Sequence, residues 1–294
     1  MRSRHGGLMW EARGHRFDCE TRTHVVGILN VTPDSFSDGG RFFDPEIAVA
    51  AGVEMAEEGA DIIDIGGEST RPGADPVKSS EELDRVIPVI KRLSAEVDVP
   101  LSIDTSKAEV AAGALGAGAS IVNDVSAGSD PKMFDVVRDA GAGVVIMHSR
   151  GGPKTMQQLT DYEDVVGEVR SYLSERLDAA IESGIEATRV VIDPGLGFAK
   201  TQEQNLLVMK EISAFASLGR PVLVGPSRKS FIGKVIHADV DDRVEGTAGA
   251  VAWLAARGAH FVRVHDVRAM VRVVRVVDAI RSADAAVPTR AERA

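Results

Sequence analysis

Short apolar runs alternate with longer segments of helical period along most of this chain. The runs are rich in Val and Ile and span four to six residues, which is typical of parallel strands buried on both faces. The pattern predicts eight strands, at 25–30, 61–65, 100–103, 120–124, 143–148, 189–193, 221–225 and 260–264. It predicts intervening helices at 45–58, 79–97, 107–115, 161–183, 203–218, 243–257 and 266–282.

Glycine–alanine pairs separate a predicted helix from the next strand at 59–60, 118–119, 141–142 and 258–259. Glycine suits this position because it readily takes the left-handed conformation that ends a helix. Eight alternating units most simply close into a (β/α)8 TIM barrel, an α/β fold whose active site lies at the carboxyl ends of the strands. A doubly wound open sheet is the alternative.

Both ends of the chain fall outside the predicted barrel. Residues 8–23, with a turn-like Gly14, predict a short N-terminal hairpin that caps the bottom of the barrel, opposite the active site. We therefore expect three parts: an N-terminal extension at 1–24, a single barrel at 25–282 and a frayed tail at 283–294.

Composition narrows the possible partners. The formal net charge of −10 argues against nucleic-acid binding, because such proteins usually present a basic face. Cys19 is the only cysteine, which excludes an intrachain disulfide and a cysteine metal cage, and the seven histidines include no H-x-x-x-H pair. We expect a cytoplasmic protein, since no apolar run is long enough to span a membrane and no signal-like stretch follows the N-terminus.

Polar side chains stand at the carboxyl ends of the apolar runs, where a buried strand needs none unless they bind something. Asp104, Asn123 and Asp193 form one such set. A carboxylate accepts two parallel N–H bonds and an amide both donates and accepts, so the set can read the edge of a pyrimidine-like ring. Alternatively, Asp104 caps a helix and Asp193 holds a Pro-Gly turn. Asp124 is predicted to support its own loop.

The loop at 64–73 has the chemistry of an anion site. Its paired glycines let backbone amides approach a phosphate, and Thr70 and Arg71 add donors. The alternative is a plain glycine-rich connection in which Asp64 or Glu68 has a structural role.

Arg263 and His265 lie two residues apart, so on a strand they face the same side. As paired cations they could hold a pyrophosphate. The alternative is an ion pair between Arg263 and Asp266 beside a core histidine.

Two further loops follow predicted strands. The loop at 30–40 mixes an amide, hydroxyls, carboxylates and an aromatic ring, and can close over a ligand or simply be solvated. The segment at 227–233 begins like a helix N-terminus, where a carboxylate or phosphate binds favourably. In this segment Lys229 could reach inward and Ser230 presents a hydroxyl group. Arg228 is interpreted as a solvated residue. A Mg²⁺ ion held mainly by substrate phosphate and one oxygen ligand is compatible with this chemistry.

Five motifs, in this order, resemble those of the dihydropteroate synthases: GILNVTPDSFSDGG at 27–40, GESTRPG at 67–73, DPGLGF at 193–198, SRKS at 227–230 and RVHD at 263–266. The resemblance runs from about residue 25 to residue 280. It implies an enzyme that joins p-aminobenzoate to 6-hydroxymethyl-7,8-dihydropterin diphosphate, giving 7,8-dihydropteroate and pyrophosphate. It also implies Mg²⁺, competition by sulfonamides and a homodimer.

The resemblance assigns roles to individual residues. Asp104, Asn123, Asp193 and Lys229 would hold the pterin, with Arg263 against its ring. Thr70, Arg71, Arg263 and His265 would hold the diphosphate, and Asn30 would contact the metal. Phe36, Asp38 and Pro72 would belong to two mobile loops that complete the p-aminobenzoate pocket, with Ser230 near its carboxylate. Asp38, Lys229 and Arg263 would be the catalytic residues.

Two rival hypotheses remain open from the sequence. The methyltetrahydrofolate–corrinoid methyltransferases share a pterin-binding barrel and the ring-reading set, but they do not need a pyrophosphate grip. A catalytically silent, pterin-binding barrel is the other, although the complete set of polar residues argues against it. The chain departs from the family pattern at Ala199, in a run that resembles Gly-Phe-Gly-Lys.

Overall fold

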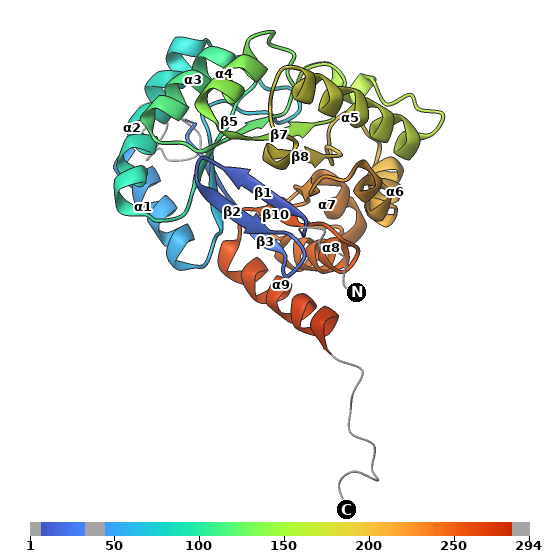
Figure 1. Cartoon of the computed structure of the whole chain (residues 1–294). Coiled ribbons are helices and arrows are strands. Elements are labelled where there is room, and N and C mark those ends of the chain that lie inside the picture. Colours follow the sequence, from blue (N-terminus) through green and yellow to red (C-terminus); the bar gives the residue numbers. More distant parts are fainter. Residues whose placement is uncertain (1–6, 33–44, 284–294) are drawn as a thin grey trace, which may run out of the picture.

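The computed structural model describes residues 7–32 and 45–283, and its eight-stranded parallel sheet curls into a barrel (Figure 1). The strands lie in the order β8-β7-β6-β5-β4-β3-β10-β9. A parallel bridge between Ile192 and Val222 joins the two ends of this order, so the sheet closes and the open-sheet alternative is excluded. The strand bounds are β3 (His24–Asn30), β4 (Ile62–Gly66), β5 (Leu101–Asp104), β6 (Ile121–Asp124), β7 (Gly143–Met147), β8 (Val190–Asp193), β9 (Leu223–Val224) and β10 (Phe261–Val264).

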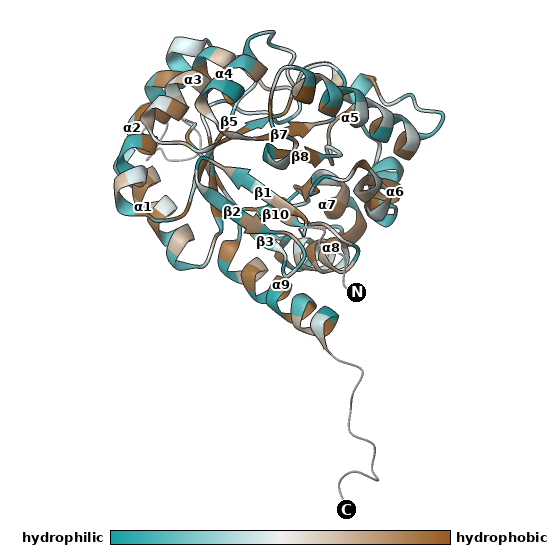
Figure 2. Ribbon diagram, viewed as in Figure 1, coloured by the Kyte–Doolittle hydropathy of each residue, from teal (hydrophilic) through white to brown (hydrophobic). Residues whose placement is uncertain are grey.

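Helices surround the strands and turn their apolar faces toward them, as the brown inner surfaces in Figure 2 show. Their bounds are α1 (Pro45–Glu57), α2 (Ser79–Glu96), α3 (Ala108–Ala117), α4 (Met133–Ala140), α5 (Val165–Glu182), α6 (Gln202–Lys210), α7 (Ser230–Ile236), α8 (Val244–Ala256) and α9 (Val267–Ser282). Three short 3₁₀ segments, η1 (Met156–Gln158), η2 (Ala187–Arg189) and η3 (Ile212–Leu218), complete the described elements. None of the helices in this part of the chain could cross a bilayer, since none is both long and apolar enough.

The predicted elements agree with this structure closely. Each of the eight predicted strands is present, and the glycines of all four Gly-Ala pairs have positive φ, from +60° to +123°. The helix expected from residue 161 begins only at Val165, because the Asp164 side chain caps it by accepting a hydrogen bond from Gly167 N. The helix expected at 203–218 is divided into α6 and η3. No range was predicted for α4 or α7, although the pair at 141–142 implied a helix before it and the segment at 227–233 was expected to begin like one.

The N-terminal hairpin closes the amino end of the barrel. Strands β1 (Met9–Ala12) and β2 (His15–Asp18) pair antiparallel across Arg13 and Gly14, which both have positive φ, as a two-residue hairpin turn requires. Trp10 is fully buried, donates from Nε1 to Arg189 O at 2.9 Å and packs edge-on against Phe261. The hairpin therefore plugs the bottom of the barrel, as predicted.

A second, smaller apolar cluster forms this plug. It joins side chains of the hairpin to the inward-facing residues at the amino ends of the strands: Trp10, Ala12, Phe17, Cys19, Val26, Ile62, Ile121, Val145, Val191, Leu223 and Phe261. The buried Cys19 thiol belongs to this core, and its burial raises its pKa to about 12. With the lower end of the barrel filled by apolar side chains, the polar strand ends are left to line the other end.

Candidate active site

The polar strand ends meet at the carboxyl end of the barrel. Asp64 lies in β4 two residues before its end, Asp104 ends β5, Asn123 is the last residue but one of β6, and Asp193 ends β8. All four are at least nine-tenths buried. Arg263 points in from β10 and completes a cluster drawn from five different strands.

Arg263 binds two carboxylates of this cluster at once. Its Nε donates to Asp64 Oδ2 at 2.6 Å and its Nη2 donates to Asp104 Oδ2 at 2.7 Å. Asn123 Nδ2 donates to the same Asp64 oxygen at 2.9 Å. Asp64 therefore holds both the Arg263 guanidinium and the Asn123 amide through one oxygen atom.

Two buried acceptors in the cluster lack a protein donor. Asp64 Oδ1 and Asp104 Oδ1 accept no hydrogen bond from the residues that the structure describes. A buried carboxylate oxygen without a donor is costly. The Asp104 oxygen therefore suits an N–H group brought by a ligand.

Burial sets the protonation of the cluster. It raises the pKa of Asp193 to about 6, against a hydrogen bond from Gly195 N and the charge of Lys229. It also raises the pKa of Asp104, which the Arg263 guanidinium opposes. Burial, followed by the charge of Arg263, lowers the pKa of Lys229 to about 8. The Lys229 ammonium also lies 4.4 Å above the Phe198 ring.

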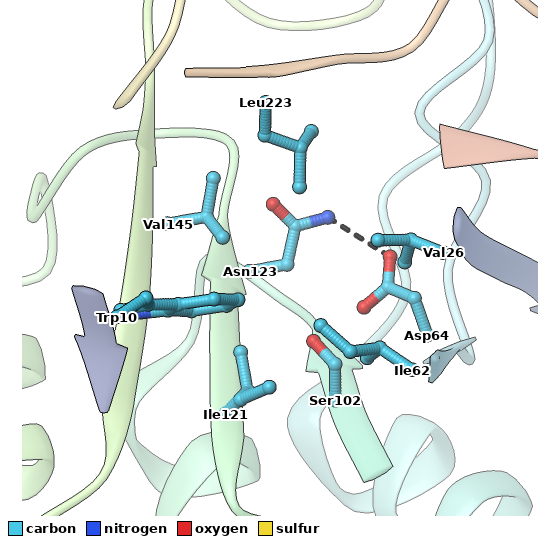
Figure 3. A pocket seen from close by; sticks show the side chains of 9 residues that line it. All are labelled: Trp10, Val26, Ile62, Asp64, Ser102, Ile121, Asn123, Val145 and Leu223. Atoms are coloured by element: carbon cyan, nitrogen blue, oxygen red, sulfur yellow. Dashed lines mark hydrogen bonds between the residues drawn. The ribbon is translucent and has the colours of Figure 1, made fainter. Parts of the chain in front are cut away.

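A small cavity of about 10 Å³ lies between this cluster and the hairpin (Figure 3). Asn123 and Asp64 face each other on one side of it, and Trp10 closes the opposite side. Ser102 also lines it. Its volume is close to the minimum for one water molecule and far too small for a bicyclic ring. A substrate must therefore bind on the other side of the cluster, toward the strand ends.

The predicted anion-binding residues lie around the same end of the barrel. Thr70, Arg71 and Pro72 occupy the loop after β4, where Arg71 and Pro72 are exposed. His265 shares a 3.0 Å hydrogen bond between its Nδ1 and Ser227 Oγ. Burial, then the charge of Arg263 and more weakly that of Arg71, lower the pKa of His265 to about 3. His265 is therefore neutral at pH 7, a correction to the expected pair of cations.

Two further expectations are corrected by the position of Asp266. Its carboxylate binds Arg228, with Nη2–Oδ1 at 2.7 Å, rather than Arg263. Arg228 is consequently a half-buried clamp between the loop after β9 and the start of α9, not a solvated residue. Lys229 follows it as the residue that precedes α7, and Ser230 is the exposed first residue of that helix.

The structure distinguishes the alternative roles of Asp104 as a helix cap and of Asp193 as a turn residue. The residue that precedes α3 is Lys107, so Asp104 is not its helix cap. Asp193 does hold its turn, because Oδ1 accepts from Gly195 N at 2.7 Å, but its position at the strand end is unchanged. Asp124 accepts from Ser126 and Gly128 and supports its loop as predicted.

Among the expected loop and metal residues, Phe36 and Asp38 lie outside the described residues. Asn30 ends β3, pairs with Gly66 of β4 and is half-buried. Its Oδ1 lies 3.9 Å from the position a Cβ on Gly66 would occupy, over the start of the anion-binding loop. No group of three His, Cys, Asp or Glu side chains in residues 7–32 and 45–283 could hold a metal. A single amide oxygen fits Mg²⁺ only when substrate phosphate supplies further ligands.

The sequence interpretation missed the role of four residues around the cluster. Asp64 was considered only for a structural role, yet it anchors Arg263 and Asn123. Phe198 lies beneath Lys229, and Lys200 is buried against His148. Asp64 and His148 carried a signal, because both are polar residues at or near the carboxyl end of an apolar run.

The acidic ring-reading set and the inward-facing cations are those of a barrel protein that binds a pterin-like ring with an anionic group. Comparison with known proteins agrees with this class. Residues 26–265 match the model of the pterin binding enzyme family, and the chain belongs to that family. Within it, the chain groups with the dihydropteroate synthases, which are transferases of folate synthesis.

Individual relatives are similar over nearly their whole length. The chain is 50% identical to a Synechocystis dihydropteroate synthase, over 90% of this chain and 92% of the relative. It is 46% identical to the Bacillus subtilis enzyme, over 88% and 89%. A solved Xanthomonas albilineans dihydropteroate synthase with 4-aminobenzoic acid superposes with a TM-score of 0.89, at 45% identity, over 95% of this chain and all of that one. Another structure of that enzyme holds 7,8-dihydropteroate.

Proposed function

We propose that this chain condenses 6-hydroxymethyl-7,8-dihydropterin diphosphate with p-aminobenzoate. The observation that carries the proposal is the buried cluster in which Asp104, Asn123 and Asp193 surround the inward-facing Arg263 and Lys229. An aminopterin ring presents N–H donors and ring acceptors on one edge, which match carboxylate acceptors and an amide. The same cluster provides positive charge toward the strand ends, where a diphosphate would project.

In the proposed reaction the exocyclic carbon exchanges its bond to the diphosphate oxygen for a bond to the aniline nitrogen. The C–O electron pair leaves with pyrophosphate, and the nitrogen then loses a proton to solvent. Arg263 and Lys229 lie where they can offset negative charge as it develops on the departing oxygen, and Arg71 can do so from the loop. No covalent enzyme intermediate is needed, because the cluster contributes by orienting both substrates.

A divalent ion fits this arrangement on the donor side. We assign Asn30 Oδ1 as the protein ligand of Mg²⁺, with the diphosphate oxygens as its main ligands. When bound, the ion would neutralise charge on the departing pyrophosphate. Thr70 and His265 would hold the diphosphate, and Phe36, Asp38 and Pro72 would complete the p-aminobenzoate pocket. Ser230, exposed at the start of α7, would contact the p-aminobenzoate carboxylate.

We also propose a cytoplasmic homodimer. The exposed apolar residues Val276 and Ile280 on α9 support an interface there, whereas Val271 and Val274 belong to the core. Light scattering would test the dimer. Sulfonamides should compete with p-aminobenzoate, as the complex of the Yersinia pestis dihydropteroate synthase with a sulfonamide drug suggests.

The decisive experiment is incubation of the purified chain with Mg²⁺, p-aminobenzoate and the dihydropterin diphosphate. We expect dihydropteroate to form, and turnover to fall at least about 100-fold in Lys229→Ala and Asp193→Ala while both variants stay folded. Removal of Mg²⁺ with EDTA should abolish turnover, and adding it back should restore turnover.

The rival hypotheses predict different results in the same assay. Binding of the dihydropterin diphosphate without product would favour a silent barrel. Methyl transfer from methyltetrahydrofolate to a corrinoid would favour the methyltransferase alternative. Full activity in either variant would remove that residue from the proposed site.

A further inference from the structure

A buried lysine lies next to the proposed pterin site without belonging to it. Lys200 is only 2% exposed, in the loop between β8 and α6. Its Nζ lies 3.0 Å from His148 Nδ1, 3.0 Å from Gly195 O and 3.1 Å from Phe198 O. Burial lowers the pKa of Lys200 to about 7, against the charge of Asp193, and in the ammonium form each of its three hydrogens has an acceptor. Because an ammonium has no lone pair, His148 Nδ1 must accept, which places the imidazole proton on Nε2.

The loop that Lys200 binds has an unusual backbone. Gly195, Gly197 and Ala199 have φ of +69°, +83° and +48°, so every second residue is left-handed. The chain also passes so close to His148 that a Cβ on Gly195 would lie 2.0 Å from the His148 carbonyl oxygen. A loop of this kind keeps one conformation only when its surroundings impose it. The Lys200 ammonium provides that constraint from inside the loop.

This loop in turn places two residues of the proposed site. Gly195 N donates to Asp193 Oδ1 at 2.7 Å, which orients the carboxylate. Phe198 presents its ring 4.4 Å from Lys229 Nζ. Lys200 binds the carbonyl oxygens of the same two residues, Gly195 and Phe198. One ammonium group thus holds both Gly195, which contacts Asp193, and Phe198, which contacts Lys229.

We propose that Lys200, with His148 as its neutral acceptor, is a positioning residue that preorganises Asp193 and Lys229 for the pterin ring. It acts through the loop at 194–199 and not on the reacting atoms. The choice of the dihydropterin diphosphate as the ligand rests on the proposed function, whereas the effect of Lys200 on the loop does not. Preorganisation of this kind improves binding because the free protein already holds the bound geometry.

A simpler alternative is that Lys200 only balances the buried charge of Asp193, since each alters the pKa of the other. The two roles differ in what happens when the acceptor changes. His148→Asn keeps an oxygen near the place of Nδ1, whereas His148→Leu removes the acceptor. Neither substitution adds or removes a charged side chain, because burial lowers the pKa of His148 to about 3. Charge balance alone predicts no difference between these variants, while positioning predicts a large one.

The experiment compares four full-length variants with the unmodified chain: Lys200→Met, His148→Asn, His148→Leu and the control Lys210→Met. Lys210 is an exposed lysine in the neighbouring helix α6. Amide hydrogen exchange reports the 194–200 segment, calorimetry reports the Kd of the dihydropterin diphosphate, and steady-state kinetics report KM for each substrate and kcat.

In Lys200→Met and His148→Leu we expect faster exchange in the 194–200 segment. We also expect Kd and KM for the dihydropterin diphosphate to rise about 10- to 100-fold, the loss typical of removing buried charge-assisted hydrogen bonds. KM for p-aminobenzoate should change less than about twofold, and His148→Asn and Lys210→Met should behave like the unmodified chain.

Unchanged exchange and Kd in Lys200→Met would overturn the proposal. If Lys200→Met does not fold, the two His148 variants decide, and equal behaviour of the two would overturn it. If the unmodified chain binds the dihydropterin diphosphate but makes no dihydropteroate, the proposed function fails, while exchange and Kd still test the positioning role.

Discussion

Replacing Asp193 with asparagine should stabilise the fold while it abolishes activity. The asparagine oxygen can still accept the 2.7 Å hydrogen bond from Gly195 N, so the loop keeps its geometry. What disappears is a negative charge on a residue that is only 5% exposed. An amide accepts fewer N–H bonds than a carboxylate, so the variant should also lose its grip on the pterin edge.

The size of the stabilisation follows from the pKa. Burial raises the pKa of Asp193 from 3.8 to about 6, a difference that corresponds to about 3 kcal/mol. Below pH 3.8 the carboxyl group is protonated in the folded and the unfolded chain, so ionisation costs nothing. As the pH rises to about 6, the unfolded chain releases a proton that the folded chain keeps, and the folded state loses stability. Above that pH the full cost is present.

The asparagine variant escapes this cost. It should therefore exceed the unmodified chain by up to about 3 kcal/mol near pH 8 and by much less near pH 4.5. The figure is an upper bound, because Lys229 and Lys200 lose a neighbouring opposite charge.

Urea unfolding followed by circular dichroism at about pH 4.5, 6 and 8 measures the effect. The matched control is Asp178→Asn, at an exposed position on α5, which should show no pH-dependent gain. A gain that does not vary with pH, or no gain near pH 8, would refute the argument that burial of the Asp193 charge destabilises the fold.

Three other substitutions test separate parts of the structure. Trp10→Ala should lower the free energy of unfolding by about 3–5 kcal/mol in urea titrations, because Trp10 is fully buried in the plug, yet leave the Kd of the pterin substrate nearly unchanged. Asp64→Asn should lower kcat/KM at least about tenfold, measured by steady-state kinetics, because Arg263 loses one of its two carboxylates. Lys107→Met should destabilise the fold by about 3 kcal/mol in the same titrations, because it leaves the fully buried Glu82 without its cation.

Strands were easier to predict than helices, and the reason is burial. The barrel strands are buried on both faces, so most of them stand out as short runs rich in Val and Ile without any periodicity. The short helix α4 follows a start signal, Asp130-Pro131, but its eight residues are too few to show a clear helical period. Helix α7 has only seven residues, lies inside a motif already assigned to ligand binding and contains Gly233.

Most members of the site could be predicted because they lie near or just beyond the carboxyl end of a strand, and the fold brings these ends together. Their partners could not be predicted, because pairing depends on positions far apart in the chain. Arg263 and Asp64 are 199 residues apart, whereas the expected partner Asp266 is only three residues away. The side chain of Asp266 turns to Arg228 instead, at the start of α9. Spacing along the sequence therefore indicated the wrong partner for Arg263, because the pairing of strands in the sheet determines which side chains meet.

The two ends of the barrel divide stability and function between them. The amino end is filled by Trp10, Phe17 and Phe261, whose burial stabilises the fold. The carboxyl end buries carboxylates and ammonium groups, and the raised pKa of Asp193 and lowered pKa of Lys229 record the energetic cost of holding their charges there. A fold selected only for stability would not keep that cluster. Its presence at one end of the barrel is therefore explained by a polar, charged substrate that these groups bind.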